Sequence, residues 1–485
     1  MTVSPTDAAA SPPLPPIIQG GMGVGVSSWR LARAVSRLGQ LGVVSATALD
    51  TVFVRRLQDG DPDGGLRRAM AHFPIPEVCE RVLRRFFRPG GRAGAPYTLL
   101  PLYRQHSGVA RQQITMLAAF AEVFLAKEGH DGPVGVNLLT KVQLPNMASL
   151  YGAMLAGVNV VLMGAGIPRE IPGVLDALAE HRPATMRLEI EGTRDDARDL
   201  LVFDPRVHAP ASVTAAPLAR PRFLAIVSAN SLAATLARKA NGQVDGFVVE
   251  GWTAGGHNAP PRGPLQLDER GEPVYGERDR VDLDKLRELG LPFWLAGGMG
   301  TPDALARALA LGAAGVQVGT LFAFCEESGI EPALRASALA EIADGTARVV
   351  TDPRASATGY PFKRMELDTV AQQDDTRIRN CDLGYLRTAF RGPDGRVVYR
   401  CAAEPVEDYV AKGGDAADTV GRRCLCNGLV ANIGLAQRRE DDGIERPLLT
   451  SGHDLEGVRA LLAANPRYGA ADAVEYLLAA VTTRA

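Results

Sequence analysis

The sequence predicts an α/β protein built as a (β/α)8 TIM barrel, with insertions and a mainly helical C-terminal extension. Short β-branched runs alternate with amphipathic stretches, a pattern typical of parallel strands joined by helices. Eight such units are found, the number that closes a barrel. The runs are apolar almost throughout, as strands buried on both faces are. An open doubly wound sheet is the competing architecture, and the count of eight favours the barrel.

Each predicted strand is a short apolar run followed by turn residues. In chain order the runs are residues 16–19, 42–45, 134–138, 158–163, 223–227, 246–250, 293–296 and 315–318. Helical periodicity predicts helices over residues 28–38 and 112–127. Residues 186–190 are a candidate for a further strand, and we assign the stretch around them to an insertion between the fourth and fifth units.

These elements divide the chain into three parts. Residues 1–13 are proline-rich and are expected to form a disordered lead-in, and residues 14–330 to form the barrel. Insertions are expected at about residues 50–111, 184–221 and 258–281. Residues 331–485 have too few alternating strands for a second barrel, so they are expected to form a helical, cysteine-bearing lobe.

Composition excludes several functional classes. The 53 Lys and Arg residues nearly balance the 55 Asp and Glu residues, which argues against a general nucleic-acid binder. The sequence contains no run of about 18 apolar residues for a membrane span, and its N-terminus lacks the pattern of a secretory signal. Six cysteines in 485 residues fit reduced thiols. We therefore expect a cytoplasmic protein.

Glycines gather where five of the predicted strands end. Barrels bind ligands at the C-terminal ends of their strands, where glycine lets backbone N–H groups approach a ligand closely. The positions are Gly20, Gly21, Gly164, Gly255, Gly256, Gly297, Gly298 and Gly319. The ends of strands seven and eight are common phosphate sites in barrels. A single glycine turn has a purely structural explanation, whereas five at one face predict a ligand site.

Two polar side chains stand at the same face. Asn137 ends the third strand, where its amide either bonds a ligand or caps the next turn. His257 follows the sixth strand on the small Ala254-Gly255-Gly256 stretch, which predicts an imidazole exposed at the barrel mouth. Imidazole titrates near neutral pH, so His257 is the predicted catalytic acid or base.

The strand-end motifs together resemble those of the FMN-dependent nitronate monooxygenases, also called 2-nitropropane dioxygenases. They comprise residues 16–23, 135–138, 254–257, 296–300 and 311–322, and the resemblance covers roughly residues 14–365. It implies a flavoprotein monooxygenase of the TIM-barrel type that binds the nucleotide FMN non-covalently. It also implies that His257 deprotonates a neutral nitroalkane. The flavin would then oxidise the alkyl nitronate or a related carbon acid, and dioxygen would reoxidise the flavin.

The resemblance assigns cofactor contacts residue by residue. Gln19, Gly20, Gly21, Met22 and Asn137 would line the flavin and ribityl, with Gly164 on the same face. Gly255 and Gly256 would approach the cofactor, while Gly297, Gly298, Gly319 and Thr320 would bind its phosphate.

The chain departs from the family pattern in ways that put the substrate in doubt. Thr253 stands where the family carries a Glu, and a Pro- and charge-rich insertion that begins at Asn258 could act as a lid. The alternative is an FMN-dependent NAD(P)H reductase of an enoyl thioester on acyl-carrier protein, or of a quinone. A barrel that has lost its chemistry and serves as a scaffold is the non-enzyme alternative.

Other features lead to weaker expectations. Cys381, Cys401, Cys424 and Cys426 could bind zinc or an iron–sulfur cluster, but their spacing favours buried thiols and no metal. The basic, aromatic stretch 81–88 either docks an acyl-carrier protein or forms a solvated helix face, and the second is favoured. A small-molecule substrate is the expected partner, and homo-oligomer formation is left open.

Overall fold

Eight parallel strands form a closed barrel in a computed structural model that describes residues 12–193, 199–439 and 443–482. The strands are β1 (Ile17–Gln19), β2 (Gly42–Ser45), β3 (Val134–Leu139), β4 (Val160–Gly164), β8 (Arg222–Val227), β9 (Gly246–Glu250), β10 (Phe293–Ala296) and β11 (Gly315–Val318). Their order is β1-β11-β10-β9-β8-β4-β3-β2. The N–H of Gln19 donates to the Leu41 carbonyl at 2.9 Å, which joins β1 to the start of β2. The predicted (β/α)8 barrel is confirmed.

The barrel interior is filled by apolar side chains. Alternate residues of each strand point inward, and they include Ile18, Val43, Leu162, Val248 and Trp294, all nearly or fully buried. Trp294 Nε1 donates to the Pro15 carbonyl at 3.0 Å, so the chain before β1 closes the bottom of the barrel.

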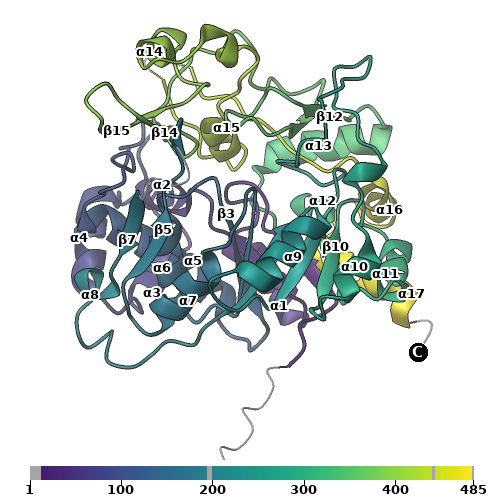
Figure 1. The fold of residues 1–485 in the computed structure, drawn as a ribbon, viewed down its shortest axis with the longest axis horizontal. Coiled ribbons are helices and arrows are strands. Elements are labelled where there is room, and N and C mark those ends of the chain that lie inside the picture. The colour runs from purple at the N-terminus through teal and green to yellow at the C-terminus, as the bar shows by residue number, and fades with distance from the viewer. Residues whose placement is uncertain (1–11, 194–198, 440–442, 483–485) are drawn as a thin grey trace, which may run out of the picture.

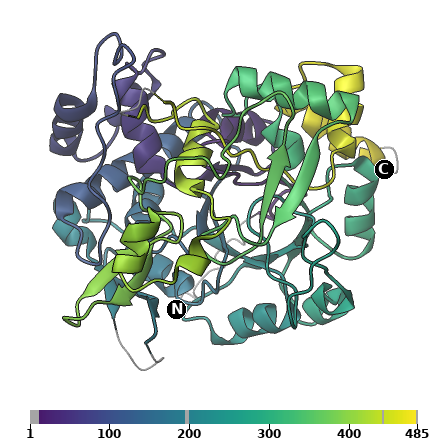
Figure 2. The same cartoon turned by 90° about the horizontal axis from the view of Figure 1, so that it is seen from above.

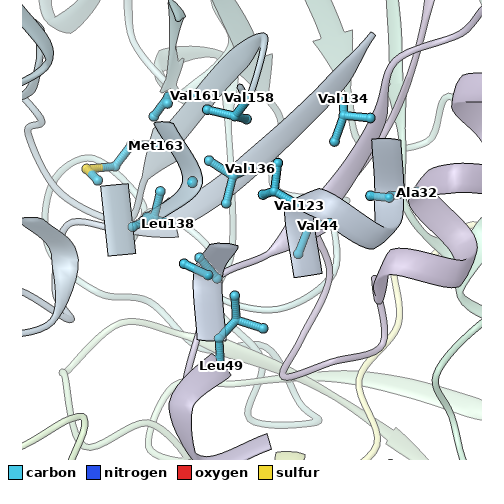
Figure 3. Packing of buried hydrophobic residues seen from close by; sticks show 14 of the residues in the cluster. Ala32, Val44, Leu49, Val123, Val134, Val136, Leu138, Val158, Val161 and Met163 are labelled. Carbon is cyan, nitrogen blue, oxygen red and sulfur yellow. The ribbon is translucent and has the colours of Figure 1, made fainter. Parts of the chain in front are cut away.

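Helices cover the outer face of the barrel (Figure 1). They are α1 (Trp29–Arg37), α5 (Val109–Lys127), α6 (Asn146–Leu155), α7 (Ile171–Ala179), α9 (Asn230–Lys239), α10 (Leu283–Arg287) and α11 (Pro302–Ala310). The short α12 (Thr320–Ala323), directly after β11, lies at the mouth of the barrel instead. Val134 and Val136 of β3 point outward and pack near Val123 of α5 (Figure 3). No helix in the described ranges combines the length and apolarity that crossing a membrane requires.

The insertions form their own small elements. After β2 the chain forms α2 (Leu49–Gln58), α3 (Gly65–Met70) and α4 (Pro76–Phe86), all packed against α5. After α7, β5 (Ala184–Arg187) pairs with β7 (Leu200–Phe203), followed by α8 (Pro205–His208). The candidate strand 186–190 is divided between β5 and β6 (Ile190–Glu191), both outside the barrel sheet.

Most of the C-terminal extension lies over one end of the barrel, whereas its last helix, α17 (Ala470–Thr482), packs against α11 and α1 on the outer side (Figures 1 and 2). Its helices are α13 (Pro332–Asp344), α14 (Val406–Ala411), α15 (Leu425–Ala431), α16 (Glu456–Ala464), α17 (Ala470–Thr482) and the 3-10 turn η2 (Ala416–Thr419). It also contains two antiparallel pairs, β12 (Arg348–Asp352) with β13 (Phe362–Glu366) and β14 (Thr388–Arg391) with β15 (Val397–Arg400). β14 pairs with β6 of the barrel insertion, so the extension shares a sheet with the barrel part of the chain.

A buried ionic network fastens the extension to the barrel. Asp50 of α2 receives a hydrogen bond from Arg111 of α5 at 2.6 Å and another from the Tyr385 hydroxyl of the extension. Burial opposes ionisation of Asp50, but Arg111 and the hydrogen bonds outweigh it, so the pKa of Asp50 lies below its ordinary value. Removing the charge of Asp50 would leave Arg111 buried without its partner.

We therefore expect Asp50→Asn to lower the free energy of unfolding by about 3–5 kcal/mol, the usual cost of breaking a buried ion pair. Asp63→Asn is the control, because Asp63 pairs with Arg30 at the surface, and it should cost less than about 1 kcal/mol. Denaturant titration measures both values. Equal losses in the two variants would contradict a structural role for the Asp50 network.

Candidate active site

The strand ends bring three polar side chains to the mouth of the barrel. Val248 of β9 points inward, so Glu250, two residues further along, also points inward. Ala296 of β10 lies between Glu250 of β9 and Gln317 of β11 in the strand register. Val134 and Val136 of β3 face outward, which turns Asn137 into the mouth. Regular strand alternation therefore places Asn137, Glu250 and Gln317 around one opening.

A cavity of about 240 Å³ occupies this opening. The predicted site residues that line it are Gly20, Gly21, Met22, Asn137, Gly164, Gly255, Gly256, His257, Gly297, Gly298, Gly319 and Thr320. The extension supplies the opposite wall, with Tyr385, Cys426, Leu449, Ser451 and Val458 among its residues. The cavity is thus enclosed between the barrel mouth and the C-terminal extension.

Gln19 is the one predicted site residue that does not line the cavity. Its side chain is fully buried, where Nε2 donates to Ser27 Oγ at 2.8 Å and Oε1 accepts from the Val43 N–H at 2.9 Å. Ser27 Oγ in turn accepts from the Met22 N–H at 2.8 Å. Gln19 thus supports the glycine turn after β1 from behind.

Two buried acceptors at the site have no hydrogen-bond donor. Asn137 Nδ2 donates to the Gly21 carbonyl at 3.0 Å, whereas Asn137 Oδ1 has no partner among the described residues. Gln317 Oε1 likewise has no hydrogen-bond partner among the described residues. A buried unpaired acceptor costs free energy, so these two oxygens indicate a ligand that offers donors. A Cβ on Gly21 would lie 2.3 Å from Asn137 Cβ, so only glycine allows this approach.

The predicted phosphate end is built from backbone. Gly297 and Gly298 both have left-handed φ angles, +89° and +66°, so a side chain at either position would be strained. Gly319 and Thr320 lie across the same cavity wall. Thr320 Oγ1 accepts a hydrogen bond from the Gly452 N–H at 2.9 Å, which leaves its hydroxyl hydrogen free to donate to a ligand.

His257 lies at the mouth, where it is partly exposed rather than open to solvent as predicted. Its Nε2 is 2.7 Å from Ser356 Oγ, and its ring packs edge-on against Phe362 with 5.0 Å between centroids. Both partners belong to the extension, which the prediction left out of the site. Burial among them lowers the pKa of His257 to about 4, so the imidazole is neutral at neutral pH.

Glu250 was missed as a site residue. Its carboxylate lines this cavity and a neighbouring one, and no described residue gives it a hydrogen bond or ion pair. Burial raises its pKa to about 7. Both Glu250 and Gln317 could have been found from the sequence, because each is a polar residue at an inward position of an otherwise apolar strand.

The four cysteines of the extension line a small cavity of about 10 Å³. Of these cysteines, Cys426 also lines the cavity at the barrel mouth. Within the described ranges no cluster of three or more His, Cys, Asp or Glu residues is arranged to hold a metal ion. Burial raises the pKa of Cys426, so its thiol is protonated at neutral pH.

The basic stretch 81–88 covers the end of α4 and the two residues that follow it. Val82 and Phe86 are buried, while Arg84, Arg85 and Arg88 are exposed. This is an ordinary amphipathic helix with a solvated basic face, and docking of an acyl-carrier protein there stays a prediction.

Fold and site together define a barrel protein with a ligand cavity at the C-terminal mouth of its strands. Residues 200–415 match the family model for nitronate monooxygenase. A nitronate monooxygenase of Pseudomonas aeruginosa is 34% identical over 203 residues, which cover 42% of this chain and 50% of that protein. A nitronate monooxygenase of Paraburkholderia phytofirmans is 34% identical over 140 residues, which cover 28% of this chain and 36% of that protein. The chain thus spans half or less of the curated relatives it matches.

Two solved structures are also similar. FabK from Thermotoga maritima has 16% identity and a TM-score of 0.46, covering 97% of this chain and 93% of that one. A nitroalkane oxidase from Streptomyces ansochromogenes has 16% identity and a TM-score of 0.43, covering 97% and 98%.

The family model and the curated relatives thus carry the name of the family that the strand-end motifs resemble. The matched residues include β9, β10 and β11, whose ends carry Glu250, His257, Gly297, Gly298 and Gln317.

Glu250 predicts a specific pH dependence of stability. Its folded-state pKa of about 7 lies above the ordinary 4.5, so between these values the folded chain holds a proton that the unfolded chain has released. The contribution of Glu250 to the free energy of unfolding should therefore fall as pH rises from about 5 to about 8. It is measured as the difference between wild type and Glu250→Gln, because His257, whose pKa is lowered to about 4, contributes in the opposite direction below its ordinary pKa of 6.5. The loss should be roughly 3 kcal/mol, since one pKa unit corresponds to about 1.4 kcal/mol.

Glu250→Gln should lack this contribution, while Glu269→Gln, at an exposed position of the insertion, should keep it. Denaturant titrations at several pH values measure the three proteins. A wild type and a Glu250→Gln variant with the same pH dependence would show that Glu250 titrates normally.

Proposed function

We propose that this protein is an FMN-dependent oxidoreductase that oxidises an alkyl nitronate or related carbon acid with dioxygen. The observation that carries the proposal is the pair of unpaired buried acceptors, Asn137 Oδ1 and Gln317 Oε1, in a glycine-walled cavity. The imide N–H of a flavin ring and the hydroxyls of its ribityl chain are donors of the kind that these oxygens require. The match of residues 200–415 to the nitronate monooxygenase family model supports the choice of a flavin cofactor.

The remaining lining fits the rest of such a cofactor. Gly20, Gly21 and Met22 present backbone close to the cavity, where a flat ring could lie without side-chain interference. Gly297, Gly298, Gly319 and Thr320 would bind the phosphate through backbone N–H groups and the Thr320 hydroxyl. When bound, FMN supplies the electron-transfer chemistry of the reaction and its reoxidation by dioxygen.

The chain itself supplies acid–base groups. In the tautomer whose Nε2–H donates to Ser356 Oγ, Nδ1 of His257 is left to accept a proton or a hydrogen bond. Glu250 adds a carboxyl group at the same mouth, where the family's Glu at position 253 is replaced by Thr. Burial raises the pKa of Glu250 and lowers the pKa of His257. Two neighbouring groups whose pKa values are shifted in opposite directions are typical of sites with an acid and a base. We assign His257 as the acid or base that acts on the substrate.

Removing the imidazole tests this assignment. His257→Ala should lower kcat/KM for neutral nitroethane by about 10²-fold or more, the usual contribution of a general base. The pre-formed ethyl nitronate, which needs no deprotonation, should be affected much less. Oxygen uptake measures both rates, and His106→Ala, at an exposed histidine, is the control.

Unchanged turnover of the nitroalkane in His257→Ala at every pH would overturn the role of His257.

Anaerobic mixing of the flavin-loaded protein with NADPH separates the proposed oxidase from the alternative NAD(P)H-dependent reductase. Slow or absent bleaching supports the oxidase, whereas rapid bleaching would instead favour the enoyl-thioester or quinone reductase.

A further inference from the structure

A second cavity of about 190 Å³ adjoins the first. The two cavities share Ala165, Ile226, Glu250 and His257, so the acid–base groups stand where they meet. The second cavity lies beside the ends of β4, β8 and β9 and is covered by the insertion after His257. Residues that touch only this cavity include Val227, Leu232, Trp252, Asn258 and Tyr275.

The insertion is held firmly over this cavity. Arg262 donates from its backbone to Asp279 at 2.8 Å and from its guanidinium to the Ser228 carbonyl at 3.0 Å, just beyond β8. The Tyr275 hydroxyl donates to the Ala259 carbonyl at 3.0 Å. These bonds close the insertion on itself and onto the barrel, so the chamber is part of the folded structure.

Most of the chamber wall is apolar. Trp252 stacks on Tyr275 with 5.5 Å between ring centroids and 6° between ring planes. Ile167, Ile226, Val227 and Leu232 add apolar surface, and the polar residues Ser228, Arg262 and Asp279 line part of the same wall. A cavity of about 150 Å³ lined by apolar side chains accommodates benzene, so this chamber has room for one aromatic ring with a short chain.

One residue of the chamber wall carries a buried polar atom without a partner. Asn258 is 2% exposed, and its Nδ2 donates to the Ala254 carbonyl at 3.1 Å. Its Oδ1 has no hydrogen-bond partner among the described residues. The chamber therefore offers an apolar wall, an unpaired acceptor and, at its junction with the first cavity, two titratable groups.

We propose that the second cavity is the substrate chamber and that it selects a carbon acid bearing an aryl group. The ring would occupy the space beside Leu232 and Trp252, with the acidic carbon at the junction by His257 and Glu250. The predicted preference in turnover rests on the proposed function. The predicted binding of an aryl ligand does not depend on it.

The test compares a small and an aryl substrate on the flavin-loaded protein. The wild type should have a higher kcat/KM for 2-phenylnitroethane than for nitroethane. Leu232→Trp fills the chamber and should lower the ratio of the two values by about tenfold or more, the scale on which apolar pockets discriminate. Nitroethane turnover and flavin content should stay unchanged, because Leu232 does not line the first cavity.

Leu267→Trp is the matched control, since Leu267 is exposed on the same insertion and lines neither cavity. Trp252→Ala is a second variant, independent of whether Leu232→Trp folds, and should raise KM for the aryl substrate alone. A wild type without aryl preference, or a preference that both chamber variants leave intact, would overturn the inference.

Binding of 2-phenylethanol, followed by calorimetry, separates this inference from the proposed function. This unreactive probe combines a ring with an O–H donor for Asn258. A wild type that oxidises no nitroalkane but binds the probe, with loss of binding in Leu232→Trp, would refute the proposed function and keep the chamber. A wild type that does not bind the probe would refute the chamber.

Discussion

The docking of the C-terminal extension onto the Gly255-Gly256-His257 loop is the contact on which the site depends. The Lys363 N–H donates to the Gly256 carbonyl at 2.9 Å, and the Asn258 N–H donates to the Pro361 carbonyl at 2.9 Å. Ser356 adds the side-chain bond to His257. A barrel mouth that would otherwise open to solvent thereby becomes an enclosed space with the loop as one wall.

The electrostatics of the site follow from this enclosure. Burial raises the pKa of Glu250 to about 7 and lowers that of His257 to about 4, because each charged form loses its hydration. Near neutral pH the Glu250 carboxyl is then partly protonated while His257 is neutral, so Glu250 can release or take up a proton in this range. Loss of the Asp50 network would loosen the extension and return both groups toward their ordinary values.

The barrel could be predicted from the sequence because its signals are local. Eight apolar runs and the glycines after them are visible without knowing any contact, and they lie within two or three residues of the observed strands. Glu250 and Gln317 follow from strand alternation once Asn137 is placed. Ser356 and Phe362 could not be predicted, because they reach His257 from about 100 residues away through tertiary packing. The strand pairs of the extension were missed for a related reason, since short strands in turn-rich sequence depend on their partners for stability.

The central claim is that the cavity between barrel and extension binds FMN. The visible absorption spectrum of the purified protein, with any cofactor released by heat and identified, tests it most directly. The account predicts the bands of oxidised flavin and released FMN, with weaker retention of FMN in an Asn137→Ala variant. A colourless wild type that takes up no added FMN would contradict the account and favour a barrel that serves as a scaffold.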